Sequence, residues 1–271
     1  MCAAEKSLAD LRREIDAVDD QMHDLIIRRA ELTLGVKAAK ARANNHVYLR
    51  LGREAQILRR LAARHSGNYP LGALVRIWRE MLCAQIPVQG PFEIAVATTG
   101  DIGLWDTARD HFGSNTAMTG FDTSEAALDA VANGSATLAV LPEPTGDAAW
   151  WPHLLDAAGP LILMKLPFIA LERRDTPSTT AYVAGLVPSE PSDDDFTVIA
   201  SRAADDLGPA LRGLDLEPHV LRSWPGLAVA EVAGFLTTDD DRVRALQQRC
   251  ADATILGAYP VPLTPFAGDT P

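Results

Sequence analysis

The chain has 271 residues, 47% hydrophobic and 23% charged, proportions typical of a globular protein with room for about two or three small domains. No apolar run approaches the roughly eighteen residues of a membrane-spanning helix, and the three cysteines are too scattered to predict a disulfide framework or a metal site. The net charge of −11 argues against a nucleic-acid partner. Residues 1–7 contain no apolar export signal, so we expect a cytoplasmic protein without a membrane partner.

The charge is unevenly distributed along the chain. Through Gly90 there are 15 Lys and Arg against 10 Asp and Glu, and after Gly90 there are 10 against 26. A basic first part within an acidic chain is consistent with a small anionic ligand.

The first predicted element is a long amphipathic helix with Ser7 as its N-cap, ending near Arg42. Its apolar residues recur in steps of three and four: Leu8, Leu11, Ile15, Val18, Met22, Leu25, Leu32 and Val36. Such a helix is ~50 Å long, too long to be covered by a helical domain of this size. We therefore expect a homodimer in which much of this face meets a second copy.

Two cations interrupt the apolar face. Arg29 stands where the pattern asks for an apolar residue, and Lys40 returns to nearly the same face about three turns, or ~16 Å, further along. A cation on a buried face needs an anionic partner, which predicts a helix bundle that binds a small anion. The alternative is that both are ordinary surface cations slightly out of phase with the apolar face.

A second helix is predicted over roughly 50–65. Glu54 is in phase with the apolar residues Ile57 and Leu61, so a carboxylate also faces the core. Arg50 and Glu54 are four residues apart and could equally form a surface ion pair.

A third helix should begin at Pro70, with Leu71, Leu74, Trp78 and Met81 facing inward. Its apolar face continues into two amides, Gln85 and Gln89. Pro87 lies between them and should kink or fray the last turn.

After Gly90 the periodicity changes to that of an α/β region. Its expected elements are strands 92–97, 137–141, 161–166 and 182–187 and helices 105–112 and 124–133. From Phe196 the order becomes βαββαβ, the ferredoxin-like pattern: strand 196–200, helix 203–212, strands 217–221 and 228–236, helix 240–250 and strand 254–258.

Residues 8 to 90 resemble the all-helical class of chorismate mutase. The resemblance is carried by Leu11-Arg12-Arg13-Glu14-Ile15-Asp16, Arg29-Ala30-Glu31-Leu32, Lys40, Arg53-Glu54 and Gln89. In that family an intertwined helical dimer rearranges chorismate to prephenate. The reaction is intramolecular and needs no cofactor.

The resemblance implies a role for each of these polar residues. Arg12 and Arg29 would hold the two carboxylates of the substrate. Lys40 and Gln89 would donate hydrogen bonds to its ether oxygen, and Glu54 would accept one from its ring hydroxyl. Lys40, Gln89, Glu54 and Arg29 are therefore the predicted catalytic residues.

Two further residues complete the predicted substrate pocket, and three positions, one of them in the pocket, differ from the family pattern. Arg53 would line the pocket, and so would Gln85, which stands where a small hydroxyl residue is common. Arg50 stands where many members have an acidic residue, and Pro87 lies just before Gln89.

The rest of the chain resembles a prephenate dehydratase followed by an ACT regulatory domain. The dehydratase likeness spans residues 120–146, and residues 255–260 (Ile-Leu-Gly-Ala-Tyr-Pro) resemble the end of an ACT domain. The middle region is shorter than a dehydratase, and Asp195-Phe196-Thr197 replaces its Thr-Arg-Phe motif. We therefore predict three domains, a helical mutase domain (1–90), a shortened dehydratase-like α/β region (91–192) and an ACT-like α+β region (193–271), without dehydratase activity.

The predicted function is that of an isomerase, a chorismate mutase of aromatic amino-acid and phenylalanine biosynthesis. A water-poor core would hold the dianionic substrate in its compact conformer and stabilise the charge on the breaking ether bond. Two alternatives remain. One is a non-catalytic dimeric protein that senses a small molecule through its ACT-like region. The other is a lyase that acts on isochorismate with the same helical fold.

Overall fold

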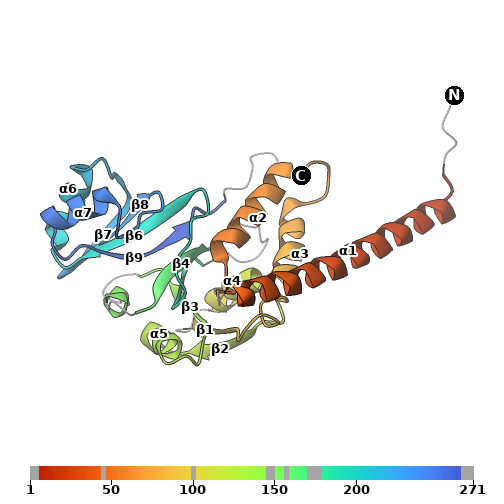
Figure 1. Cartoon of the computed structure of the whole chain (residues 1–271), viewed down its shortest axis with the longest axis horizontal. Coiled ribbons are helices and arrows are strands. Elements are labelled where there is room, and N and C mark those ends of the chain that lie inside the picture. The colour runs from red at the N-terminus through yellow and green to blue at the C-terminus, as the bar shows by residue number, and fades with distance from the viewer. Residues whose placement is uncertain are drawn as a thin grey trace. The chain divides into compact units, whose positions relative to one another are not determined.

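The computed structural model describes residues 6–43, 47–98, 102–144, 150–155, 159–169 and 179–263 (Figure 1). Contacts divide the chain into two compact units, one of Met1–Tyr48 with Val88–Gly90 and one of Leu49–Pro87 with Pro91–Pro271. The domain boundaries at residues 90 and 192 stay predictions. None of the described helices is long and apolar enough to cross a membrane.

Helix α1 (Leu8–Arg42) dominates the first unit, as the spacing predicts. Its start is fixed by a capping box. The Asp10 amide donates to the Ser7 hydroxyl (3.1 Å), and the Ser7 amide donates to the Asp10 carboxylate (3.2 Å). These two bonds satisfy backbone donors that a free helix end would leave without partners.

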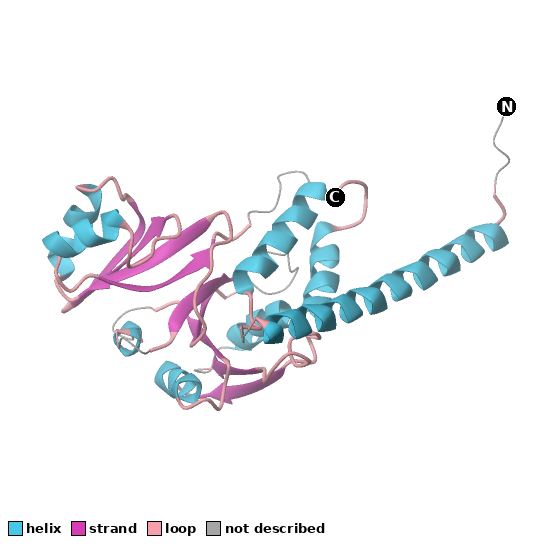
Figure 2. Ribbon diagram, viewed as in Figure 1, coloured by secondary structure: helices cyan, strands magenta, loops and turns pink. Residues whose placement is uncertain are grey.

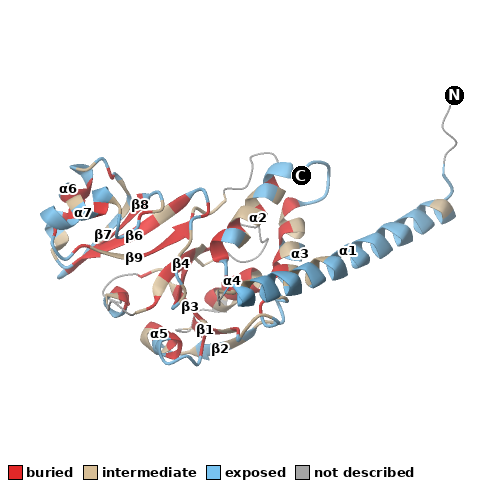
Figure 3. Ribbon diagram, viewed as in Figure 1, coloured by how far each residue is buried: buried red, intermediate tan, exposed pale blue. Residues whose placement is uncertain are grey.

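The apolar face of α1 is exposed in the single chain. No residue of α1 is buried, and its large apolar side chains range from Ile26 at 42% to Leu25 at 65% exposed (Figure 3). An apolar stripe of this length in contact with water is typical of a helix that packs on another protein surface.

The C-terminal end of α1 is tied to the two short segments of its own unit. Lys37 Nζ donates to the Val88 carbonyl (2.7 Å), and Lys40 Nζ donates to the Val47 carbonyl (2.8 Å). A Cβ on Gly90 would lie 2.7 Å from the Tyr48 ring, so only glycine allows this close approach.

Helices α2 (Leu51–Arg64) and α3 (Leu71–Cys83) open the second unit. The buried residues of α3 are Leu71, Val75, Arg79, Leu82 and Cys83, whereas Leu74, Trp78 and Met81 are half-buried. Leu71 is buried as predicted, and Leu74 and Trp78 pack against the same core cluster. The prediction is incomplete, because the most buried face also includes Val75, Arg79 and Leu82. The helix ends at Cys83, short of Pro87, so Gln85 and Gln89 lie beyond it.

A nine-stranded sheet follows, in the order β2-β1-β3-β5-β4-β9-β6-β8-β7. Its strands are magenta in Figure 2. Its first half contains β1 (Glu93–Ala97), α4 (Ile102–Phe112), β2 (Ala117–Phe121), α5 (Ser124–Ala132), β3 (Leu138–Pro142), η1 (Trp151–Leu154), β4 (Leu161–Leu166) and β5 (Ala181–Gly185). β1 pairs in parallel with β2 and β3, and β5 is antiparallel to its neighbours. The largely exposed edge strand β2 was not among the expected elements.

The second half has the βαββαβ order that the sequence predicts: β6 (Asp195–Ser201), α6 (Ala204–Arg212), β7 (Pro218–Trp224), β8 (Leu227–Ala233), α7 (Asp241–Arg249) and β9 (Thr254–Pro260). Residues of α6 and α7, including Leu207, Leu211 and Leu246, share one buried cluster with Ala230 and Val232 of β8. The two helices therefore cover one face of these strands.

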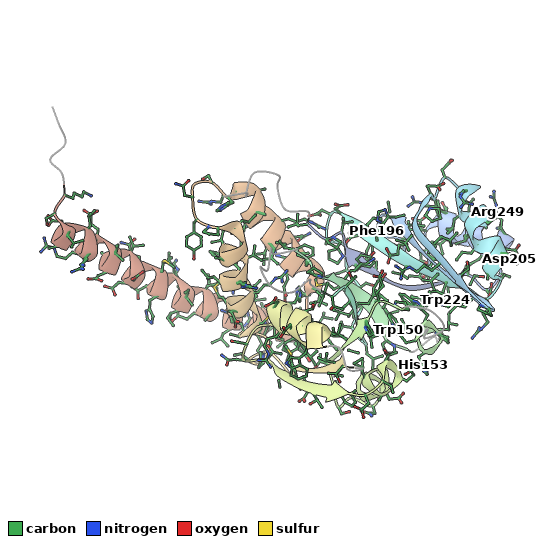
Figure 4. All side chains as sticks on the ribbon, turned by 180° about the vertical axis from the view of Figure 1, so that it is seen from behind. Trp150, His153, Phe196, Asp205, Trp224 and Arg249 are labelled. Carbon is green, nitrogen blue, oxygen red and sulfur yellow. The ribbon has the colours of Figure 1, made fainter. Side chains whose placement is uncertain are left out.

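The two halves of the sheet meet where β4 pairs with β9. Ile162 is opposite Gly257, whose φ of +134° and close approach to the Ile162 backbone exclude a side chain. Beside this contact, Lys165 Nζ of β4 lies 3.1 Å from the buried Glu231 carboxylate of β8, which also accepts a hydrogen bond from the Tyr182 hydroxyl. The buried Trp150, labelled in Figure 4, packs on Tyr182, so this cluster joins the halves.

Candidate functional site

Three predicted site residues lie on α1, at widely separated positions along the helix axis. Arg12 is exposed, and Arg29 and Lys40 are half-buried. Because α1 is one continuous helix, Arg12 and Arg29 are ~25 Å apart along its axis, and Arg12 and Lys40 are ~42 Å apart. A single chain therefore does not bring Arg12 to the position of Lys40.

Gln89 belongs to the same compact unit as Lys40. The adjacent carbonyl, that of Val88, is held by Lys37, which lies three residues before Lys40 on α1. Lys40 and Gln89, the two predicted donors to the ether oxygen of the substrate, therefore both lie near the C-terminal end of α1. Arg29 and Lys40 already have interaction partners within the chain.

Arg53 and Glu54 lie in the first turn of α2, in the second unit. The Arg53 guanidinium is exposed and donates to the side-chain oxygen of Gln56 (3.2 Å), while Glu54 is half-buried. The structure therefore gathers Arg53 and Glu54 in one turn. Gln85 follows α3 and is half-buried.

The sequence analysis missed a buried cation whose charge interacts with that of Glu54. Arg79 of α3 is only 4% exposed, and its Nη1 donates to the Asp110 carbonyl (3.3 Å). Its Nε and Nη2 have no hydrogen-bond partner among the described residues. Burial lowers the pKa of Arg79 to about 10, opposed by the charges of Cys83, Asp110 and Glu54. Arg79 is therefore still cationic at neutral pH and attracts the Glu54 carboxylate electrostatically.

The sequence contained a signal for Arg79. It lies four residues after Val75 and three before Leu82, which is the spacing of one buried face. The signal was missed because the inward face of this helix was assigned to the neighbouring residues.

His111 of α4 is buried beside the same guanidinium. Burial, and then the charge of Arg79, lowers the pKa of His111 well below its usual range. The unfolded chain therefore binds a proton at His111 that the folded chain does not bind once the pH falls below about 6.5.

This difference predicts that the free energy of unfolding falls with decreasing pH, by up to about 1.4 kcal/mol per pH unit below about pH 6.5 from this group alone. Urea unfolding between pH 7.5 and pH 5 should show a shallower pH dependence in His111→Gln than in the wild type. The matched control is His153→Gln, since His153 is exposed. An unchanged pH dependence in His111→Gln would contradict the prediction.

Comparison with known proteins finds a family model that matches the helical part. Residues 11–90 match the family model of chorismate mutase type II. The bifunctional chorismate mutase/prephenate dehydratase of Pseudomonas aeruginosa is 24% identical over 159 residues, which are 57% of this chain and 44% of that protein. The chain thus spans less than half the length of this relative.

Two solved structures also match part of this chain. A structure described as GqqA, a novel type of quorum quenching acylase, is 18% identical with a TM-score of 0.46, over 66% of this chain and 98% of that chain. The prephenate dehydratase of Streptococcus mutans is 13% identical with a TM-score of 0.42, over 62% and 98% respectively.

The resemblance drawn from the sequence is confirmed for residues 11–90. The similarity to the bifunctional protein is longer than this segment, so it continues beyond the helical part.

Proposed function

We propose that this chain is a chorismate mutase, an isomerase that rearranges chorismate to prephenate in the biosynthesis of aromatic amino acids, on the route to phenylalanine. The observation that carries the proposal is the match of residues 11–90 to the type II mutases. The polar residues of this segment, Arg12, Arg29, Lys40, Glu54 and Gln89, are of the kinds the reaction needs.

Each group has a physical task in this proposal. Arg12 and Arg29 hold the two carboxylates and keep the flexible dianion in its compact conformer. Lys40 and Gln89 donate to the ether oxygen, where negative charge grows as the bond breaks. Glu54 accepts the hydrogen bond of the ring hydroxyl, and the cationic Arg79 attracts its carboxylate electrostatically. None of these tasks requires a cofactor.

The active form in this proposal is a cytoplasmic homodimer. The exposed apolar face of α1 supports it, because burial of such a face is worth about 25 cal/mol per Å². The βαββαβ half in this proposal is an ACT-like region, supported by its order of elements.

We propose further that the chain does not act as a dehydratase. Where the dehydratase motif would stand, Thr197 is buried and used structurally. Its hydroxyl donates to the Gly234 carbonyl (2.7 Å) and accepts from the Leu236 amide (2.8 Å). Asp195 in the same triplet accepts the Ser192 amide (2.8 Å).

The test is to offer chorismate and prephenate separately to the purified chain. We expect chorismate to disappear with formation of prephenate, and prephenate to persist without formation of phenylpyruvate. Steady formation of phenylpyruvate would overturn the second half of the proposal.

Isochorismate, added as a third substrate, lets the assay decide between the mutase and its two rivals. The ferredoxin-like order of the last six elements favours a small-molecule sensor, and a protein that leaves both chorismate and isochorismate unchanged would be of this kind. Release of pyruvate from isochorismate, with chorismate untouched, would instead identify the lyase.

A further inference from the structure

The segment between β5 and β6 forms hydrogen bonds and an ion pair with the first turns of α2. Glu190 accepts the Arg53 amide (3.2 Å) and forms an ion pair with Arg50. The Arg53 amide lies in the first helical turn, whose donors have no partner within the helix. A carboxylate at a helix N-terminus also opposes the positive end of the helix dipole. Glu190 therefore fixes the backbone at Arg53.

The backbone of α2 approaches this segment as closely as a glycine permits. A Cβ on Gly52 would lie 2.8 Å from Glu190 Cγ and 2.9 Å from the Glu190 carbonyl oxygen. The first turn of α2 and residue 190 are thus in direct contact, and a displacement of one must displace the other.

A second connection reaches the Arg53 side chain. Asp193 accepts a hydrogen bond from Gln56 Nε2 (3.0 Å), which orients the amide so that its oxygen accepts from Arg53 Nη1 (3.2 Å). The order of contacts is Asp193, Gln56, Arg53. Backbone and guanidinium of one residue are therefore both held from a segment about 137 positions later in the chain.

The segment between β5 and β6 is itself held in place by further hydrogen bonds. Arg59 of α2 donates to the carbonyls of Ser192 (2.5 Å), Asp194 (2.7 Å) and Val261 (2.8 Å). Ser192 is fully buried and bound to the Asp195 carboxylate through its amide. These contacts join α2 to the start of β6 and the end of β9.

We propose that Glu190 and Asp193 are positioning residues for the mutase reaction, which act by holding Arg53 and the first turn of α2. The inference rests on the proposed function, since Arg53 and the neighbouring Glu54 belong to the substrate pocket only if the chain is a mutase. The α/β region is then part of the catalytic apparatus, and a shift of the β5–β6 segment changes turnover.

The first experiment compares Asp193→Gly with Asp215→Gly in the full chain. Both aspartates have a positive φ (+77° and +56°), so glycine fits each backbone without strain and removes one carboxylate. Asp215 is exposed on the turn after α6. We expect Asp193→Gly to lower kcat/KM about tenfold, because small displacements of binding groups cost this much or more. Asp215→Gly should match the wild type, and both should unfold at the same temperature.

A double-mutant cycle separates positioning from general damage. Gln56→Ala should lower kcat/KM as much as Asp193→Gly, and the double variant should lose no more than either single one. Losses that multiply in the double variant would overturn the proposal, and so would equal activity of Asp193→Gly and Asp215→Gly.

A second readout does not depend on activity. In Glu190→Ala the Arg53 amide loses its acceptor, so its hydrogen exchange should accelerate while that of core amides in β6 stays unchanged. Unchanged exchange at Arg53 would overturn the proposal. A wild-type chain that leaves chorismate unchanged would overturn the proposed function instead, and the exchange measurement would still decide whether Glu190 holds Arg53.

Discussion

Lys40→Ala is expected to lower kcat by a factor on the order of 10² or more, while KM changes little. The reason is that the partner of Lys40 in the proposed reaction is the ether oxygen, whose charge appears only as the bond breaks. Removal of one preorganised donor to such a charge has costs of this size in other enzymes. Steady-state kinetics with chorismate measures both constants.

The structure requires a control for this substitution, because Lys40 also donates to the Val47 carbonyl (2.8 Å). Lys40→Met keeps most of the side-chain stem but also loses the bond to Val47, so both variants must unfold at the wild-type temperature for the loss of kcat to be assigned to the ether oxygen. Arg42→Ala removes an exposed cation of the same last turn of α1 and should keep wild-type kinetics. An effect of Lys40→Ala confined to KM would mean that Lys40 binds a carboxylate of the substrate.

Local patterns predicted the elements well where the pattern was long. The steps of three and four along α1 and its cap at Ser7 and Asp10 are confirmed, because helical periodicity and capping involve neighbours in sequence. The βαββαβ order is also confirmed. β2 was missed because its sequence, Ala-Met-Thr-Gly-Phe, contains one β-branched residue and a glycine, which is a weak strand pattern.

The candidate site was predictable only as a set of residue types. Arg79 and the contacts of Glu190 and Asp193 with α2 depend on tertiary packing between positions far apart in the chain. No periodicity within one helix reveals which distant segment will cover it. For the same reason the sequence offered Arg50 only a neighbour, Glu54, as a partner, whereas the structure pairs it with the distant Glu190.

The uneven charge of the chain now has a partial explanation. The basic surplus before Gly90 was attributed to a small anionic ligand. Within the second unit, Arg50 and Arg76 pair with Glu190 and Asp110, and Arg59 binds carbonyls of the acidic half. Part of the surplus therefore joins the helices to the α/β region.

The length of α1 decides how its cations can meet a substrate. A molecule of the size of chorismate spans well under about 10 Å, and an arginine side chain reaches only about 7 Å. Arg12 and Lys40 are ~42 Å apart on one continuous helix, so a single chain cannot apply both to one molecule. If both serve one site, as the proposed function requires, a second copy must supply Arg12. A symmetric dimer then contains two such sites.

Mixing the variants Arg12→Ala and Lys40→Ala should therefore restore activity, although each alone is inactive. In a mixed dimer, one site receives the intact Lys40 of one chain and the intact Arg12 of the other. The second site lacks both. Random reassembly makes about half of the dimers mixed, so activity should approach roughly a quarter of the wild-type value. The rate of chorismate loss after unfolding and joint refolding measures it.

The control mixture pairs Arg12→Ala with the double variant Arg12→Ala/Lys40→Ala. It undergoes the same exchange of subunits but contains no intact Arg12, so it should stay inactive. Exchange is verified with a tag of different mass on one partner. Each variant refolded alone is measured beside the mixtures, so that an effect of refolding as such is separated from recovery by subunit exchange. A demonstrably mixed, folded population without activity would show that Arg12 does not act across the dimer, and the exposed face of α1 would then need a different partner.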